Sequence, residues 1–223
     1  MNIKLFYMAL TRYLVGVELV FLLLFIPAGS VNYWNGWLFM GLLFIPIFIV
    51  GIIMMIKNPA LLKNRLSAKE KEKKQKTVVM LSGLMFLAGF IVAGLNYRFS
   101  WTKLSNTTII ISSVVFILAY ILYAEVLREN TFLSRTIKVQ ENQKVIDTGL
   151  YGIVRHPMYL TTLFLFLSIP LILNSIISFI IFLMYPIIII IRILNEEKFL
   201  EKNLKGYKEY KKKVKYRLIP FIW

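Results

Sequence analysis

The stretch MYLTTLFLFLSIPLILNSIISFIIFLMYPIIIIIRI (residues 158–193) decides the fold, because it holds two apolar runs in immediate succession. The first run, residues 158–173, is short and contains Pro170, and the second occupies residues 175–193. Only Asn174 and its neighbours separate them, so the sequence predicts a tight helical hairpin. About 20 residues are needed to cross the hydrocarbon core of a membrane. The first arm is therefore marginal, and the hairpin is expected either to span or to reach only the far interface.

Four longer apolar runs precede the hairpin, at residues 5–26, 34–56, 77–96 and 107–127. The chain is 58% hydrophobic, with a mean hydropathy of +0.70, which exceeds the usual range of soluble domains. These features predict an all-α, polytopic integral membrane protein with five to six transmembrane helices and a cytoplasmic C-terminal helix. We divide it into residues 1–127, with four spans, and residues 128–223, with a long loop, the hairpin and a polar tail.

Lysine and arginine are distributed unevenly between the connecting segments. Eight lie in residues 57–76, five in residues 128–155 and ten in residues 192–223, whereas the loops on the other side hold none and two. The positive-inside rule places the basic segments and both termini in the cytoplasm, and we expect a multi-pass protein of the cell membrane. The net charge of +16 is then explained by contact with anionic lipids rather than by nucleic-acid binding.

The basic loop at residues 57–76 predicts a short helix at the membrane interface. Pro59 suits a first helical turn, with Asn58 as its cap. Leu61, Leu62 and Leu66 fall on one face of that helix, and charged residues occupy the rest. Topology and lipid contact are favoured over a substrate-binding role. A second amphipathic helix is expected in the tail after residue 193, where apolar and aromatic residues recur at helical spacing.

The one histidine of the chain, His156, lies at the entrance to the first arm of the hairpin. Pro157 is suited to the first position of a helix, whose free N–H groups and dipole would favour an anionic ligand. Tyr159 adds a hydroxyl on the same turn. The alternative is an ordinary interfacial anchor, and the local pattern does not decide between the two. Because the chain has no cysteine, one histidine is too few for a zinc site.

Arg192, Glu196 and Glu197 form a second candidate cluster, at the exit of the last apolar run. Arg192 and Glu196 are four residues apart, so their side chains share a helical face. Acidic residues at this depth are costly unless they are paired or used. A structural ion pair is one reading. The hairpin, however, brings this exit beside the start of its first arm, so both clusters should meet in one pocket next to the long loop.

The residues DTGLYGIVRHPMY (147–159), Arg192-x-x-x-Glu196-Glu197 and Gly206-Tyr207-x-x-Tyr210 resemble the isoprenylcysteine carboxyl methyltransferase family, in its bacterial branch. The wider group includes integral-membrane phospholipid N-methyltransferases. Leu150 departs from the pattern, because many relatives carry proline there. The resemblance implies an enzyme that transfers a methyl group from S-adenosylmethionine. Its implied cofactor-binding residues are Gln143, Lys144, Val145, Ile146, Tyr151, His156, Pro157, Met158, Tyr159, Glu196 and Glu197.

The resemblance places Arg192 on the substrate side, where its guanidinium would position an acceptor carboxylate for O-methylation. The expected acceptor is a lipophilic or lipid-modified molecule that enters from the bilayer. N-methylation of a lipid amine, sterol-type reduction with NADPH on a similar scaffold, and a non-enzymatic small transporter are the alternatives. The sequence leaves open the acceptor, the oligomeric state, and the role of Arg12 and Glu18 in the first span.

Overall fold

The computed structural model describes residues 3–66, 73–134, 136–137 and 139–223. All regular secondary structure in these residues is helical. The N-terminal half contains α1 (Ile3–Ala28), α2 (Trp34–Lys57), the short α3 (Pro59–Leu66), α4 (Lys73–Phe99) and α5 (Asn106–Glu129). The C-terminal half contains a 3₁₀ turn, η1 (Gly149–Gly152), followed by α6 (Pro157–Ile172), α7 (Ile176–Phe182), α8 (Met184–Asn203) and α9 (Tyr207–Lys213).

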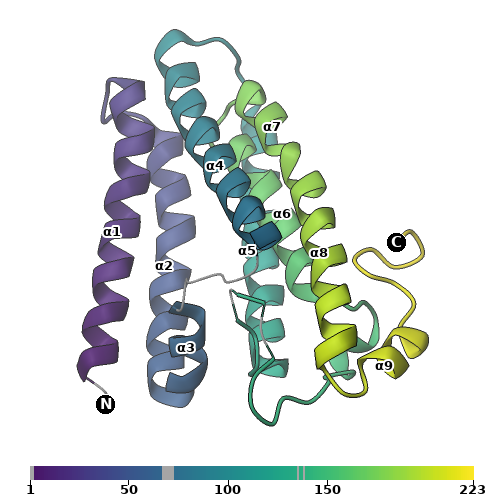
Figure 1. Cartoon of the computed structure of the whole chain (residues 1–223). Coiled ribbons are helices and arrows are strands. Elements are labelled where there is room, and N and C mark those ends of the chain that lie inside the picture. The colour runs from purple at the N-terminus through teal and green to yellow at the C-terminus, as the bar shows by residue number, and fades with distance from the viewer. Residues whose placement is uncertain (1–2, 67–72, 135, 138) are drawn as a thin grey trace.

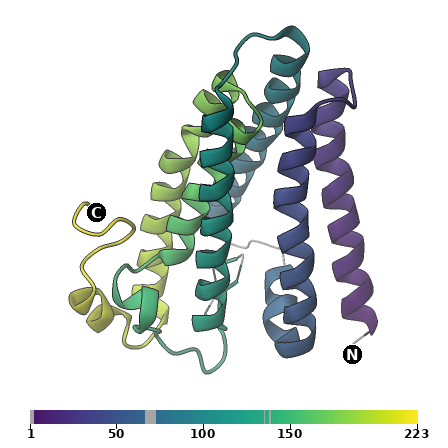
Figure 2. The same cartoon turned by 180° about the vertical axis from the view of Figure 1, so that it is seen from behind.

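The helices form one bundle, with α1 and α2 side by side at one edge and α8 at the other (Figures 1 and 2). The N-terminus, α3 and α9 lie toward the same end, which we call the basal end (Figure 1). Within the described residues, five helical segments are long and apolar enough to span a membrane: α1, α2, Gln75–Phe99, α5, and α7 together with α8. The predicted all-α membrane fold is therefore confirmed.

The predicted hairpin consists of α6 and α7, joined by a turn at Asn174. The φ angle of Asn174 is +60°, a left-handed conformation that asparagine tolerates. Its side-chain Oδ1 accepts a hydrogen bond from the Leu104 N–H at 2.6 Å, and its carbonyl accepts one from Asn96 at 2.9 Å. Tyr33 donates to the neighbouring Leu173 carbonyl at 2.6 Å. Three separate segments thus hold the turn at the end opposite the basal end.

The first arm of the hairpin is as short as predicted. The 16 residues of α6 extend for about 24 Å at the usual helical rise, which is less than the roughly 30 Å hydrocarbon core. Two close contacts pack α4 against the hairpin. Ser178 donates to the Gly89 carbonyl at 2.8 Å, and a Cβ atom at Gly89 would lie 2.3 Å from the Phe182 ring. A small residue at position 89 therefore permits the close approach of α4 and α7.

The last span differs from the prediction. It runs over Ile176–Asn203 rather than ending near residue 193, so most of the expected tail helix is the continuation of α8. After Leu204 the chain turns, and the separate helix is only the seven-residue α9. The span is interrupted at Leu183, between α7 and α8. Pro186 explains the interruption, because proline lacks an N–H and its ring clashes with the carbonyl four residues earlier, at Phe182.

Candidate functional site

A pocket opens at the basal end, between the segment that follows α5, the turn η1, the start of α6, and helices α8 and α9. It contains about 780 Å³ of empty space, including its open mouth. Nine of the predicted residues line it: Gln143, Lys144, Val145, Ile146, Tyr151, His156, Met158, Tyr159 and Glu196. The predicted convergence of the hairpin entrance and the last span is therefore present in the structure.

Three predicted residues lie outside the lining. Pro157 is buried and occupies the first turn of α6, where the His156 carbonyl accepts the N–H groups of Tyr159 and Leu160. It fixes the start of the helix that carries two lining residues. Arg192 lies behind Tyr159, and Glu197 lies in a buried ion-pair cluster. A cofactor-binding role for Pro157 and Glu197 and a substrate role for Arg192 stay predictions.

The turn η1 is fixed by Glu129 at the end of α5. Its carboxylate accepts the Leu150 N–H, with oxygen distances of 3.1 and 3.2 Å. A proline at position 150 would lack this donor, which gives Leu150 a physical role at the position where the sequence departs from the family pattern. Gly149 has a φ of +52°, and a Cβ there would lie 1.5 Å from a Glu129 oxygen. Only glycine therefore fits this approach.

Replacing Gly149 by alanine is expected to lower the stability of the folded protein by about 2 kcal/mol. The new methyl group would expel the Glu129 carboxylate, and the backbone would be held in a strained left-handed conformation. Thermal unfolding should move down by roughly 5 °C. The matched control is Gly83→Ala, at a helical site with open space around its Cβ. Equal melting temperatures for the two variants would contradict the assigned role of Gly149.

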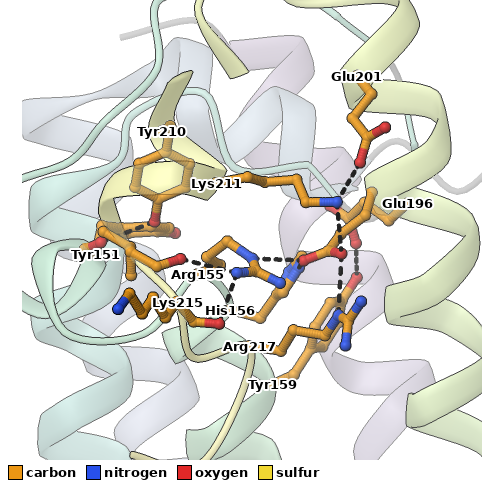
Figure 3. A network of polar contacts seen from close by, with 12 residues as sticks. Tyr151, Arg155, His156, Tyr159, Glu196, Glu201, Tyr210, Lys211, Lys215 and Arg217 are labelled. Carbon is orange, nitrogen blue, oxygen red and sulfur yellow. Dashed lines mark hydrogen bonds and ion pairs between the residues drawn. The ribbon is translucent and has the colours of Figure 1, made fainter. Parts of the chain in front are cut away.

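The carboxylate of Glu197 is the centre of the buried ion-pair cluster. Arg155 Nε lies 2.7 Å and His156 Nε2 lies 3.3 Å from Oε1, and Arg217 Nε lies 3.0 Å from Oε2. Lys211 Nζ follows at 3.8 Å (the four partners are labelled in Figure 3). The Glu197 side chain is only 4% exposed. With both oxygens engaged, this carboxylate holds the base of the site together.

Arg155 connects the buried ion-pair cluster to the C-terminal segment. Its Nη1 donates to the carbonyls of Val214 and Lys215, both at 2.8 Å, and its backbone N–H donates to the Tyr216 carbonyl at 2.9 Å. On the other side, the Tyr210 hydroxyl donates to the Tyr151 carbonyl at 2.7 Å (Figure 3). These bonds fasten the segment that follows α8 across the hairpin entrance, where Tyr210 also lines the pocket.

Glu196 faces the pocket, whereas its neighbour Glu197 faces the cluster. The Tyr159 hydroxyl donates to Glu196 Oε2, and it accepts a hydrogen bond of 2.8 Å from Arg192 Nε. The Arg192 guanidinium also lies 5.8 Å from the centre of the Tyr159 ring. The shared helical face predicted for Arg192 and Glu196 therefore exists, with a tyrosine hydroxyl between them. The Glu196 carboxylate retains lone pairs that can accept hydrogen bonds from a ligand in the pocket.

Aromatic side chains supply much of the pocket wall. His156 stacks on Tyr159, with ring centres 5.6 Å apart, and Tyr151, Tyr207 and Tyr210 complete the wall. Burial raises the pKa of Tyr151, Tyr207 and Tyr210 well above the usual range, so their hydroxyls stay neutral donors. The Tyr207 residue is 4% exposed, and its hydroxyl has no hydrogen-bond partner among the described residues. A buried, unpaired hydroxyl in a pocket wall indicates a missing ligand contact.

Sequence reasoning did not assign eleven of the lining residues. They are Asn130, Phe132, Leu133, Ser134, Thr136, Ile137, Arg155, Leu200, Leu204, Tyr207 and Tyr210. The helical spacing of the last four and the motif Gly206-Tyr207-x-x-Tyr210 are signals that could have pointed to α8 and α9. The lining residues between 130 and 137 belong to no motif, and only the fold brings them to the pocket.

Comparison with known proteins agrees with the geometry. Residues 107–206 match a family model described as phospholipid methyltransferase. The mouse Delta(14)-sterol reductase TM7SF2 is 31% identical over 91 residues, which are 40% of this chain and 22% of the reductase. The chain thus matches less than a quarter of that relative. The family match covers α5, the loop, the hairpin and α8, which together carry every predicted site residue. The segment that carries the candidate site is therefore similar to the phospholipid methyltransferase family of integral-membrane methyltransferases, which includes isoprenylcysteine carboxyl methyltransferase-like proteins.

Proposed function

We propose that the protein is an S-adenosylmethionine-dependent methyltransferase that acts on a lipophilic acceptor at the cytoplasmic face of the cell membrane. The observation that carries the proposal is the pocket itself. It joins a carboxylate, a buried hydroxyl that has no partner among the described residues, and an aromatic wall at the edge of apolar helices. Most of its lining lies within the segment that matches the methyltransferase family.

The residues present fit the cofactor chemically. Glu196 would accept hydrogen bonds from the ribose hydroxyls or the amino group, and the Tyr207 hydroxyl would gain the partner it lacks. Backbone groups of Gln143, Lys144, Val145 and Ile146 and the apolar and aromatic side chains would enclose the adenine. When bound, S-adenosylmethionine supplies a methyl group on a sulfonium, which an acceptor atom takes as the sulfur leaves with the electron pair of the broken bond.

Carboxylate O-methylation is the reaction that we favour. A carboxylate is already ionised at neutral pH, so the protein needs to align the acceptor rather than remove a proton. Arg192 is held beside Tyr159 and would orient such a group through its guanidinium. A lipid amine, the acceptor in the N-methylation alternative, would have to arrive deprotonated. Because residues 107–206 match a model described as phospholipid methyltransferase, N-methylation of a lipid amine stays the alternative reaction.

Calorimetric titration of the purified protein separates the proposed functions. S-adenosylmethionine and S-adenosylhomocysteine are expected to bind, and NADPH is not. The reverse result would favour the reductase, which the mouse sterol reductase match keeps as a second candidate. Well-folded protein that binds neither sulfur compound would exclude the methyltransferase and leave the small transporter. Mass spectrometry of host lipids with and without the protein would then find the acceptor by a methylation mass shift.

Arg192→Lys is expected to reduce methyl transfer at least tenfold while it changes the dissociation constant of S-adenosylmethionine by no more than about threefold. Lysine keeps the charge but loses the planar fork that binds a carboxylate with two hydrogen bonds. Transfer of a radioactive methyl group and calorimetry on the same preparation give the two values. A parallel loss of cofactor affinity would instead place Arg192 in the cofactor site.

A further inference from the structure

A second, larger groove lies outside the segment that matches the methyltransferase family. It runs between α1, α2 and α3 toward the basal end, where these helices lie together in both views (Figures 1 and 2). Its empty space is about 1220 Å³, including the open side. The walls are apolar, with side chains such as Phe6, Leu10, Phe48, Ile52 and Met55. Walls of this kind suit a hydrocarbon chain.

Two arginines, Arg12 and Arg65, line this groove, and no acidic residue does. Neither arginine forms an ion pair with a carboxylate of the described residues. Arg12 is exposed on the first membrane helix, and Arg65 is half-buried at the end of α3. Cationic groups at membrane depth are costly without a counter-ion and mark functional sites. The described side chains of the groove therefore provide no counter-ion for these two arginines, and an anionic ligand would supply one.

Arg65 also connects the groove with the cofactor pocket. Its guanidinium contacts the Tyr123 hydroxyl and lies 5.6 Å from the centre of that ring. Its Nη1 lies 3.6 Å from the sulfur of Met158, and Met158 lines the cofactor pocket. An anionic group held by Arg65 would thus lie against the wall of that pocket, while its apolar chain extends along α1 and α2.

We propose that this groove binds the methyl acceptor, as an apolar chain that ends in a carboxylate. The chain occupies the space between α1, α2 and α3, and Arg65 binds the carboxylate at the boundary with the cofactor pocket, where Arg192 then orients it for methyl transfer. Arg12 adds positive charge along the groove. The assignment as acceptor site rests on the proposed methyltransferase function, whereas binding of the amphiphile does not. Residues 6–66 thereby gain a functional role beside that of the family-matched segment.

The charge of the groove favours a carboxylate over an amine. The arginine fork matches the two oxygens of a carboxylate. An ammonium headgroup would meet two cations and no acid. We therefore commit to a carboxylate-terminated chain, which carries no ammonium. A zwitterionic amine lipid, whose phosphate also matches an arginine fork, is the competing occupant in the test.

Photolabelling in phosphatidylcholine nanodiscs tests the groove directly. The probe is a palmitate analogue with a diazirine in its chain, and its methyl ester is the neutral control. The acid is expected to label residues 6–13 and 47–56, read by peptide mass spectrometry, about tenfold more strongly than the ester. Unlabelled palmitate should compete. Arg65→Gln and Arg12→Gln should each weaken labelling by the acid several-fold and leave the ester unchanged. Arg12 makes no ion pair with the described residues, so its variant does not depend on the contacts of Arg65.

Gly51→Phe supplies the steric control. Gly51 lines the groove, and a Cβ at this position meets no other atom within 4 Å. A phenylalanine there should block labelling by both probes without disturbing the core. Equal labelling by acid and ester, labelling unaffected by both arginine variants, or stronger labelling by a phosphatidylethanolamine probe would overturn the proposal.

Calorimetry with S-adenosylmethionine on the same variants keeps the two proposals apart. Cofactor binding without acid-selective labelling would contradict the acceptor groove but not the methyltransferase function. Selective labelling without cofactor binding defeats the methyltransferase function and leaves a groove that binds carboxylate amphiphiles. Both results together, with loss of methyl transfer to palmitate in Arg65→Gln and Gly51→Phe, are the outcome that we expect.

Discussion

Glu197→Gln is expected to destabilise the folded protein by about 3–5 kcal/mol, the usual effect of removing one partner from a buried ion pair. The substitution leaves Arg155 buried beside a neutral amide, with the Arg217 and Lys211 charges close by. Because Arg155 also holds the carbonyls of Val214 and Lys215, the C-terminal segment should detach from the pocket. Thermal unfolding followed by tryptophan fluorescence should show a decrease on the order of 10 °C.

The matched control for this prediction is Glu201→Gln. Glu201 also pairs with Lys211, but its side chain is 31% exposed, and surface ion pairs contribute about 0–1 kcal/mol. Its melting temperature should therefore stay within a few degrees of the unsubstituted protein. If Glu197→Gln were equally stable and had only lost cofactor affinity, Glu197 would be a ligand of the cofactor, as the family resemblance implies, rather than the centre of a structural cluster.

Much of the fold follows from local patterns in the sequence. The apolar runs are long enough to predict their helices one by one, and Asn174 between two runs predicts the hairpin turn. The cap at Asn58 also behaves as expected, because its side chain accepts the Leu61 N–H at 3.1 Å. The end of α8 was misplaced since membrane exit and helix termination are different events. The helix continues through polar residues that pack against the pocket.

The site was only partly predictable, because adjacent residues can face opposite environments. Glu196 and Glu197 look equivalent in the sequence, and their roles diverge only where the segment at 214–217 returns to Arg155. The same long-range return buries Tyr207 in the pocket wall. The hairpin makes the meeting of the two clusters predictable, since a short connection forces the two ends of the arms together. The sequence offers no comparable signal for the position of the segment after α8.

Glu196→Gln should weaken S-adenosylmethionine binding by roughly 10- to 100-fold and leave the melting temperature nearly unchanged. A hydrogen bond to a charged group contributes about 1.5–3 kcal/mol, and each 1.4 kcal/mol is a factor of ten in affinity. The glutamine oxygen still accepts from Tyr159, so the wall of the pocket should persist. Calorimetry and thermal unfolding on one preparation measure both properties.

The comparison with Tyr207→Phe makes the prediction for Glu196 decisive. Removing the Tyr207 hydroxyl breaks no hydrogen bond within the described residues, so it should not destabilise the protein. It should weaken cofactor binding by a smaller factor, because a neutral donor contributes about 0.5–1.5 kcal/mol. If both groups contact different parts of one ligand, the two losses should add in the double variant. Unchanged affinity in Glu196→Gln would remove this carboxylate from the cofactor site, and the Arg192–Tyr159–Glu196 chain would then be structural, like its neighbour at Glu197.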